Sequence, residues 1–89
     1  MPAAGEKWEF QQEEGKIIIE AVEVNSTRDF RGRPAFMIAY RIIDETTKPP
    51  FISPVAHLFI LKGSDPRKEF ERVVNNYVVM KKSITRPIT

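Results

Sequence analysis

The stretch Lys16–Ile43, KIIIEAVEVNSTRDFRGRPAFMIAYRII, decides the fold of this chain. Two apolar runs, 16–24 and 34–43, are rich in β-branched and aromatic residues and flank the polar segment Asn25–Gly32. β-branched and aromatic side chains pack well on a pleated surface, whereas Asn, Ser, Asp and Gly favour turns. The pattern therefore predicts two antiparallel strands joined as a hairpin, with 25–32 as the loop.

The first run departs from simple alternation. Ile17 and Ile19 fall on one face of a strand, while Val22 and Val24 fall on the other. One extra residue near Glu20–Ala21 would bring all four to a common face. Such a β-bulge bends a strand and helps a sheet to curl. The alternative is a strand covered on both faces, which a domain of this size rarely supplies, so we favour the bulge.

Two further segments lie outside this hairpin. Residues 7–12, KWEFQQ, alternate so that Trp8 and Phe10 share one side of a strand. After the break 44–50, residues 51–63 suit either a helix capped at Ser53 or a buried strand. We favour a Ser-Pro break followed by a strand.

The C-terminal third carries the helix signal. Ser64 or Asp65 can cap a helix whose first turn contains Pro66. Its apolar face has helical spacing and consists of Phe70, Val73, Val74 and Tyr77. Asn75-Asn76 leave two alternatives for residues 77–82, either a closing strand or a continuation of the helix.

The predicted fold class is therefore α+β. We expect a small curled antiparallel sheet, or a partly open barrel of three to five strands, with one amphipathic helix near the C-terminus. The 89 residues form a single domain (1–89) in which residues 1–6 and 83–89 are frayed. The chain shows no recognisable family motif.

The composition argues against an enzyme. The chain has no cysteine, and its single histidine, His57, lies in an apolar run rather than beside a nucleophile. The carboxylate pairs Glu13-Glu14 and Asp44-Glu45 fall in predicted turns, and the glycines are scattered singly. We therefore expect no catalytic residue, no metal, no cofactor and no small-molecule substrate.

The sequence also bears on location. No signal peptide is visible, and no apolar run approaches the roughly 20 residues that span a bilayer. The lack of cysteine is compatible with a reducing compartment. These features predict a cytoplasmic (intracellular) protein without a membrane partner.

The charges are unevenly distributed, although the net charge is only +2. Residues 1–24 contain six glutamates and two lysines, and residues 25–42 contain four arginines and one aspartate. From Lys62 onward, seven basic residues accompany three acidic ones. Charge asymmetry of this kind either keeps the strand and helix surfaces solvated or provides charged surfaces that engage a partner.

The candidate binding residues follow from this distribution. Arginine and lysine contact phosphates, and aromatic rings stack on bases. The residues that could serve a nucleic acid or another partner in this way are Arg28, Phe30, Arg31, Arg33, Arg41, Arg67, Lys68 and Arg72. The alternative is a plain polar turn, in which Arg28 pairs with Asp29, Arg33 pairs with an acid across the hairpin, and Phe30 folds beneath the loop.

Two functions from different classes remain. The first is a non-enzymatic protein-interaction module (an adaptor, a small inhibitor or an accessory subunit) that acts through a sheet edge and a charged surface. Self-association into an oligomer belongs to this reading. The alternative is a nucleic-acid-binding module that uses the basic hairpin 28–33 and the basic C-terminal helix. We rank protein interaction slightly ahead because its requirements are weaker: a small core without disulfides often gains from a partner, and edge strands offer unpaired backbone groups.

Overall fold

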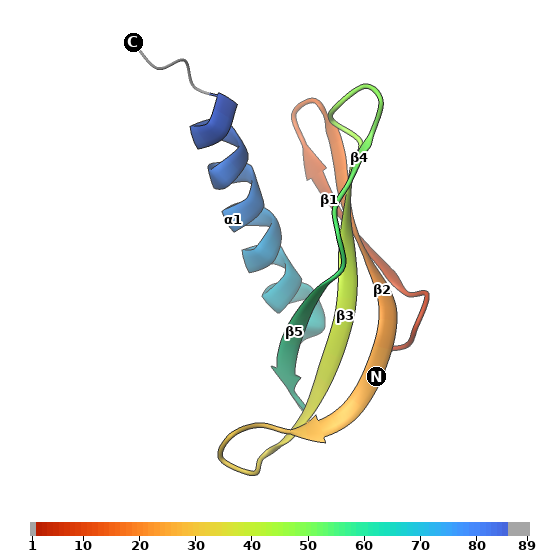
Figure 1. Ribbon diagram of the computed structural model, residues 1–89, viewed down its shortest axis with the longest axis vertical. Coiled ribbons are helices and arrows are strands. Elements are labelled where there is room, and N and C mark those ends of the chain that lie inside the picture. Colours follow the sequence, from red (N-terminus) through yellow and green to blue (C-terminus); the bar gives the residue numbers. More distant parts are fainter. Residues whose placement is uncertain (1, 86–89) are drawn as a thin grey trace.

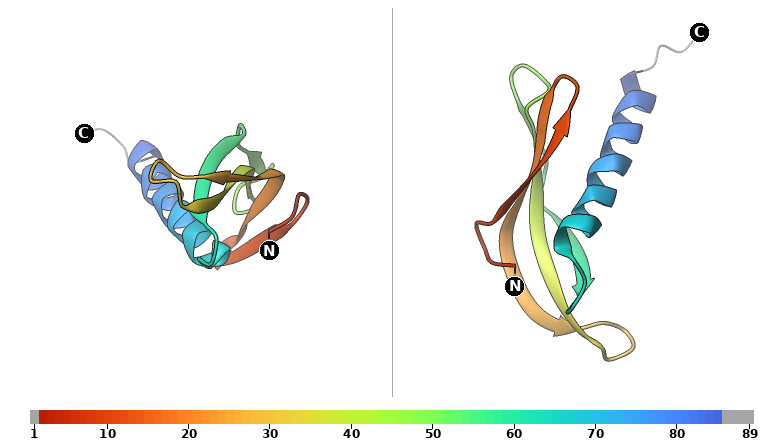
Figure 2. Two further views of the ribbon diagram at one scale, coloured as in Figure 1. Left: turned by 90° about the horizontal axis from the view of Figure 1, so that it is seen from below. Right: turned by 180° about the vertical axis from the view of Figure 1, so that it is seen from behind.

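The chain folds into one antiparallel sheet and one helix in the computed structural model, which describes residues 2–85 (Figure 1). The elements in chain order are β1 (Lys7–Gln12), β2 (Gly15–Arg28), β3 (Pro34–Asp44), β4 (Phe51–Ile52), β5 (Ala56–Leu61) and α1 (Pro66–Thr85). The strand order is β1-β2-β3, and both β4 and β5 pair with the other edge of β3. The sheet curls without closing, and α1 lies beside its concave side (Figure 2). The predicted α+β class is confirmed.

The β2–β3 hairpin is longer than the sequence predicts. Its pairing runs from Ile17 opposite Asp44 to Arg28 opposite Pro34. The segment 25–28, which we expected to be loop, is therefore strand, and only residues 29–33 form the turn. Backbone pairing with the apolar start of β3 outweighs the turn preference of the polar side chains, because the ladder requires only main-chain groups.

The predicted bulge is present one position later than expected. The register shifts between Ala21 and Glu23, which makes Val22 the extra residue. Ile19 is fully buried on the core face, and Val24 packs against the core after the bulge. Val22 itself is 38% exposed, so the expectation that it joins the core face is wrong. A bulged residue has no partner in the ladder and is free to turn outward.

The ambiguous stretch after β3 is a Ser-Pro break followed by a strand, as favoured. The Ser53 backbone N–H donates to the carbonyl of Ile42 at 2.9 Å, and the Ile42 N–H donates to Ser53 Oγ at 2.8 Å. Pro54 has no N–H with which to continue the ladder. The edge strand therefore stops at Ile52 and resumes at Ala56.

Residues 77–82 continue the helix and do not form a closing strand. Helix α1 runs without interruption from Pro66 to Thr85, so residues 83–85 belong to it. The expected fraying at the two ends falls partly on residues 1 and 86–89, which lie outside the described residues. At the N-terminal end, the Gly5 N–H donates to the carbonyl of Ala21 at 2.8 Å.

The core lies between the concave side of the sheet and the first half of α1. Phe70 is fully buried, and its ring centroid lies 4.8 Å from that of Trp8 in β1 and 5.3 Å from that of Tyr40 in β3. Val74, one helical turn later, is buried as well. One aromatic side chain of the helix therefore joins strands that are not neighbours in the sheet.

We expect Phe70→Ala to lower the free energy of unfolding by about 3–5 kcal/mol, because it leaves a cavity beneath Trp8 and Tyr40. Urea denaturation followed by circular dichroism measures the loss. Val79→Ala is the matched control, since Val79 is 64% exposed on the same helix, and it should change the stability by less than about 0.5 kcal/mol. Equal effects of the two substitutions would contradict this account of the core.

Candidate functional site

The tip of the β2–β3 hairpin is organised by Asp29. Its Oδ1 accepts hydrogen bonds from the backbone N–H groups of Arg31 (2.9 Å) and Arg33 (2.8 Å), and its Oδ2 accepts one from Arg33 Nε at 2.7 Å. Burial raises the pKa of this carboxyl, but the hydrogen bonds from Arg33 and Arg31 outweigh it and hold the pKa below its usual value. Gly32 supplies the left-handed backbone that the turn needs, with φ of +77°.

The remaining residues of the tip divide into two kinds. Arg28 donates from Nη1 to the carbonyl of Gly32 at 2.7 Å and so closes the turn rather than pairing with Asp29. Phe30 is 89% exposed and does not fold beneath the loop. The Arg31 guanidinium lies 5.4 Å from the centroid of the Phe30 ring. Phe30 and Arg31 are therefore the predicted tip residues that remain available to a partner.

Two of the other predicted basic residues are held by the sheet. Arg41 Nε lies 3.1 Å from Glu20 Oε1 and forms an ion pair with it. The Nε–H group is buried and is not directed at a hydrogen-bond acceptor in the described part of the chain. Arg67 donates from Nη2 to the carbonyl of Glu9 at 2.8 Å, and its guanidinium lies 4.6 Å from the centroid of the Phe10 ring. Arg67 therefore helps to hold the start of α1 against β1.

Lys68 and Arg72 are exposed on α1. Arg72 lies 3.7 Å from Glu69, one turn earlier on the helix. Within residues 2–85, Lys68 has no carboxylate at ion-pair distance. The predicted basic residues thus fall at the hairpin tip, on the outer face of β3 and along α1, and several already have partners within the fold. They do not form one carboxylate-free face.

The sheet edge formed by β4 and β5 is open along β5, whereas at β4 the Phe51 ring stacks on Tyr77 of α1 with the ring centroids 6.4 Å apart. The Lys62 N–H donates to the carbonyl of Pro34 at 3.0 Å, which fixes the alternation of hydrogen bonds along β5. By that alternation, the N–H and C=O groups of His57, Phe59 and Leu61 point away from β3, but the Leu61 C=O already accepts a hydrogen bond from the Ser64 N–H at 3.0 Å. Among the residues that the structure describes, no strand pairs with this side of β5. Both backbone groups of His57 and Phe59, and the N–H of Leu61, are therefore available to an added strand.

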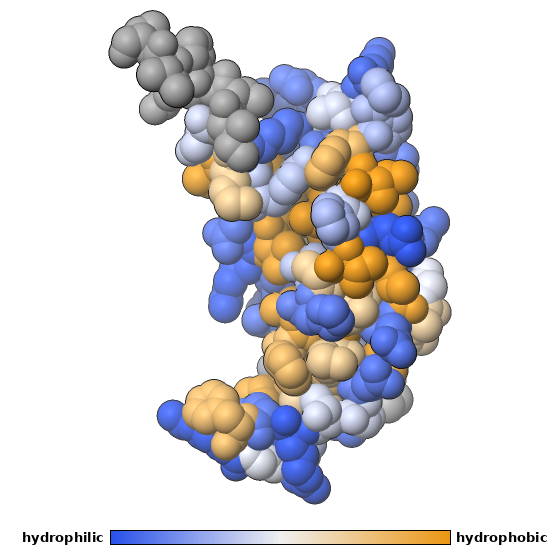
Figure 3. All heavy atoms as spheres, viewed as in Figure 1, coloured by the Kyte–Doolittle hydropathy of each residue, from blue (hydrophilic) through white to orange (hydrophobic). Residues whose placement is uncertain are grey.

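The side chains along this edge are apolar and exposed. Ile52 is 57% exposed, Val55 49% and Phe59 56%, and the segment 51–61 contains no Asp, Glu, Lys or Arg. Figure 3 shows apolar residues over the part of the molecule where β3, β4 and β5 lie. The sequence predicts interaction through a sheet edge but does not identify the residues of that edge. The feature that could have identified the edge is the absence of charged residues from 51–61, but a buried strand would show the same feature.

The opposite edge, β1, is protected by charge. Its outward residues Lys7 and Glu9 are both exposed and pair with β2, Lys7 with Glu20 at 3.9 Å and Glu9 with Lys16 at 3.3 Å. Charged side chains on an edge strand are a common protection against pairing with other chains. The two edges of one sheet therefore differ, and only the β5 edge lacks this protection along its length.

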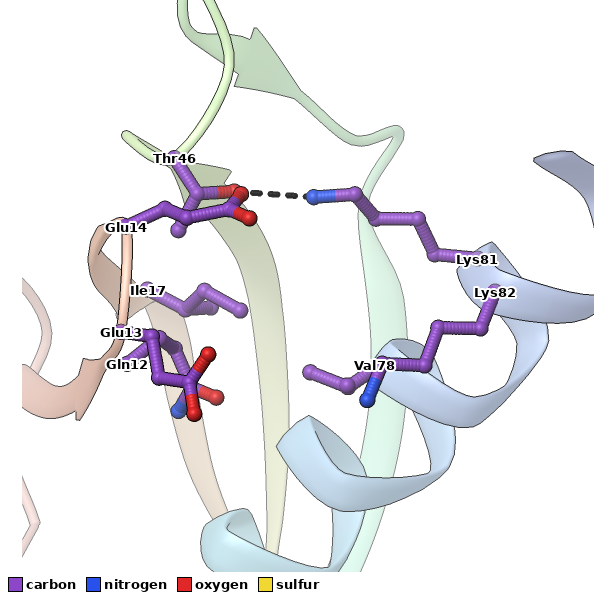
Figure 4. Close-up of a pocket in the computed structure, with 8 residues that line it drawn as sticks. All are labelled: Gln12, Glu13, Glu14, Ile17, Thr46, Val78, Lys81 and Lys82. Atoms are coloured by element: carbon purple, nitrogen blue, oxygen red, sulfur yellow. Dashed lines mark hydrogen bonds between the residues drawn. The ribbon is translucent and has the colours of Figure 1, made fainter.

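A pocket of about 410 Å³ lies at the other end of the molecule from the hairpin tip, between the β1–β2 turn and the second half of α1 (Figure 4). Glu13 and Glu14 line it on the turn side, and Lys81 and Lys82 line it on the helix side. His57 is not among the lining residues. The pocket therefore has opposed charges but no general base of the histidine type.

Beside this pocket, a buried carboxylate ties α1 to the sheet. Asp44 is fully buried, and its Oδ2 accepts hydrogen bonds from the Tyr77 hydroxyl (2.7 Å) and from Lys81 Nζ (2.8 Å). Its Oδ1 accepts one from the Thr46 backbone N–H at 2.9 Å. Burial raises the pKa of Asp44, but the bonds from Lys81, Thr46 and Tyr77 prevail and lower it to about 2. Burial and the same carboxylate raise the pKa of Tyr77.

Comparison with protein-family models, with curated proteins and with solved structures found no match to this chain. Residues 2–85 contain no group of three or more His, Cys, Asp or Glu that could hold a metal ion. In the same part of the chain, no helix combines the length and the apolar character needed to cross a membrane. The site must therefore be judged from its geometry alone.

The Asp44 cluster predicts a specific acid sensitivity. Because the pKa of Asp44 is about 2 in the folded protein and 3.8 ordinarily, its contribution to stability is complete above about pH 4 and is lost as the pH falls toward 2. Asp44→Asn should lower the free energy of unfolding at pH 7 by about 1–3 kcal/mol. Urea titrations across this pH range should show that the difference in the free energy of unfolding between the wild-type protein and Asp44→Asn disappears near pH 2. A difference in unfolding free energy that does not change with pH would refute the stabilising role of the ionised Asp44 carboxylate.

Proposed function

We propose that this domain is a non-enzymatic protein-interaction module that binds an extended segment of a protein partner along its β4–β5 edge. The observation that carries the proposal is the open backbone of His57 and Phe59, together with the Leu61 N–H, flanked by apolar side chains. An added strand satisfies those backbone groups and buries the exposed apolar surface in the same step. Burial of a single large side chain contributes roughly 1.5–3 kcal/mol.

The difference between the two sheet edges supports this proposal. An exposed edge without charge is a liability for a chain that stays alone, because it pairs with other strands. The β1 edge is protected by Lys7 and Glu9, whereas β5 offers its full six residues uncharged. The position of His57 on that exposed edge, away from the pocket, supports a binding role over a catalytic one.

A photoreactive residue placed in the edge tests the proposal. With p-benzoylphenylalanine at position 59, irradiation of cells that express the protein should yield covalent adducts with a protein. The same residue at position 11, an exposed site on β1, is the matched control and should yield few. Adducts are separated by mass and identified by mass spectrometry. Absence of adducts at position 59, or equal yields at the two positions, would reject the β5 edge as the binding surface.

Nucleic-acid binding at the hairpin tip is the second candidate, and one observation favours it. Phe30 is almost fully exposed, with the Arg31 guanidinium beside its ring, which resembles the stacking pair that single-stranded binders use. It ranks second because Arg28 and Arg33 hold the turn and Arg41 pairs with Glu20.

Fluorescence anisotropy with a labelled single-stranded oligonucleotide tests this second candidate. If the tip binds, affinity should fall steeply as salt rises, and Arg31→Glu should weaken binding by about tenfold or more. Lys48→Glu, a charge change of equal size at an exposed position of the β3–β4 turn, is the matched control and should have a smaller effect. An oligonucleotide that does not bind even at low salt removes this candidate.

A further inference from the structure

We propose that the partner strand is β5 of a second copy of this chain, paired antiparallel about a two-fold axis that passes beside Phe59. This inference rests on the proposed function, since it uses the same edge and names its occupant. The two sheets would join into one continuous sheet, with both α1 helices on the same side. Such an interface uses the same surface on both copies and is closed.

The positions of the open backbone groups select this register. In an antiparallel pair, a residue whose N–H and C=O point across the interface must face another such residue. Centring the axis at Phe59 places Phe59 opposite Phe59 of the second copy and His57 opposite Leu61 of the second copy. Both backbone groups of Phe59 are then paired, the Leu61 N–H meets the His57 C=O, and the His57 N–H shares the Leu61 C=O with the Ser64 N–H. A shift of the axis to position 58 places Leu61 opposite Val55, in the break between β4 and β5, and loses this match.

The side chains that meet in this register are compatible. Phe59 lies opposite Met37 of β3 and so belongs to the outer face of the sheet. The two Phe59 rings would lie side by side on that face, and aromatic cross-strand pairs stabilise antiparallel sheets. No carboxylate or cation lies within β5 of either copy, so no buried charge would be left without a partner.

The charge distribution also favours an antiparallel arrangement of two copies. The basic hairpin tip and the β1–β2 and β3–β4 turns lie at opposite ends of the molecule (Figure 1). Glu13, Glu14 and Glu45 are exposed at the turn end, where Lys48 and, from α1, Lys82 are exposed as well, so the exposed carboxylates there are only slightly in excess. Antiparallel pairing of β5 directs the tip of each copy toward the carboxylate-bearing end of the other and keeps the two tips apart. Charge complementarity thus points to a second copy.

Sedimentation equilibrium tests the association. The wild-type protein should approach twice the 10.3 kDa of one chain as its concentration rises. Phe59→Lys places a charge at the axis of each copy and should raise the dissociation constant of the dimer by about 100-fold or more. Val79→Lys adds the same charge at an exposed apolar site of α1 and should leave the dimer unchanged. Because Phe59 is more than half exposed, circular dichroism should show both variants folded.

Cysteine pairs test the register, since the chain contains no cysteine of its own. In this register Ala56 lies opposite Lys62 of the second copy in a non-hydrogen-bonded pair, where Cα atoms are about 4.5 Å apart and a disulfide fits. Mixed Ala56→Cys and Lys62→Cys proteins should form a disulfide-linked dimer on mild oxidation. Either variant alone should not. Cross-linking that is as strong in a single variant as in the mixture would overturn the register.

The outcomes separate this inference from the proposed function. A wild-type protein that remains a monomer at every concentration, while position 59 forms adducts with a different protein, overturns self-association and leaves the edge as a binding surface. A monomer without adducts at position 59 removes both. Dimers that Phe59→Lys does not weaken overturn the β5 interface, because association would then use another surface.

Discussion

The backbone ladder between β2 and β3, with its extra residue at Val22, is the constraint on which the rest of the structure depends. It aligns Ile19 and Ile38 with the concave side of the sheet, and the bulge lets Val24 return to that side. A bulge also increases the local twist of a strand. In a small sheet the resulting curl narrows the concave side until a single helix covers it, which explains how a chain without cysteine builds a core.

A single helix cannot protect both edges of a curled sheet. Near its start, α1 is held against β1 by Arg67, and Phe70 packs on Trp8. Farther along, the Tyr77 and Lys81 side chains reach Asp44 at the end of β3. These contacts hold the start of α1 beside β1 and hold its second half beside the pocket. The edge of β5 is left uncovered along the backbone groups of residues 57 and 59, so its exposure follows from the way the helix is anchored.

The sequence predicted the features that depend on neighbouring residues and missed those that depend on distant ones. The hairpin, the bulge and the Ser53-Pro54 break can be predicted because they follow from the alternation of apolar and polar residues and from the turn preferences of neighbouring residues. The continuation of α1 through residues 77–82 was left open because β-branched residues have weak helix propensity. It is supported by bonds to Asp44, which lies more than thirty positions earlier in the chain. At the candidate site, the arginines of the tip could be named, but not that Asp29 holds Arg33. Whether a strand is an edge depends on its neighbours in the sheet, so the open side of β5 could not be read from its residues.

The same features that open the β5 edge also limit what can be added to it. Pro54 interrupts the edge before β5, and Lys62 follows its last residue, so an added strand meets six uncharged residues and no more. Pairing with a second copy uses this edge in both chains at once. The edges that remain belong to β1, where Lys7 and Glu9 oppose further pairing. A head-to-tail contact would instead leave one edge of each copy free and would allow a filament to grow. The asymmetry between a charged β1 and an uncharged β5 therefore favours an assembly that stops at two chains.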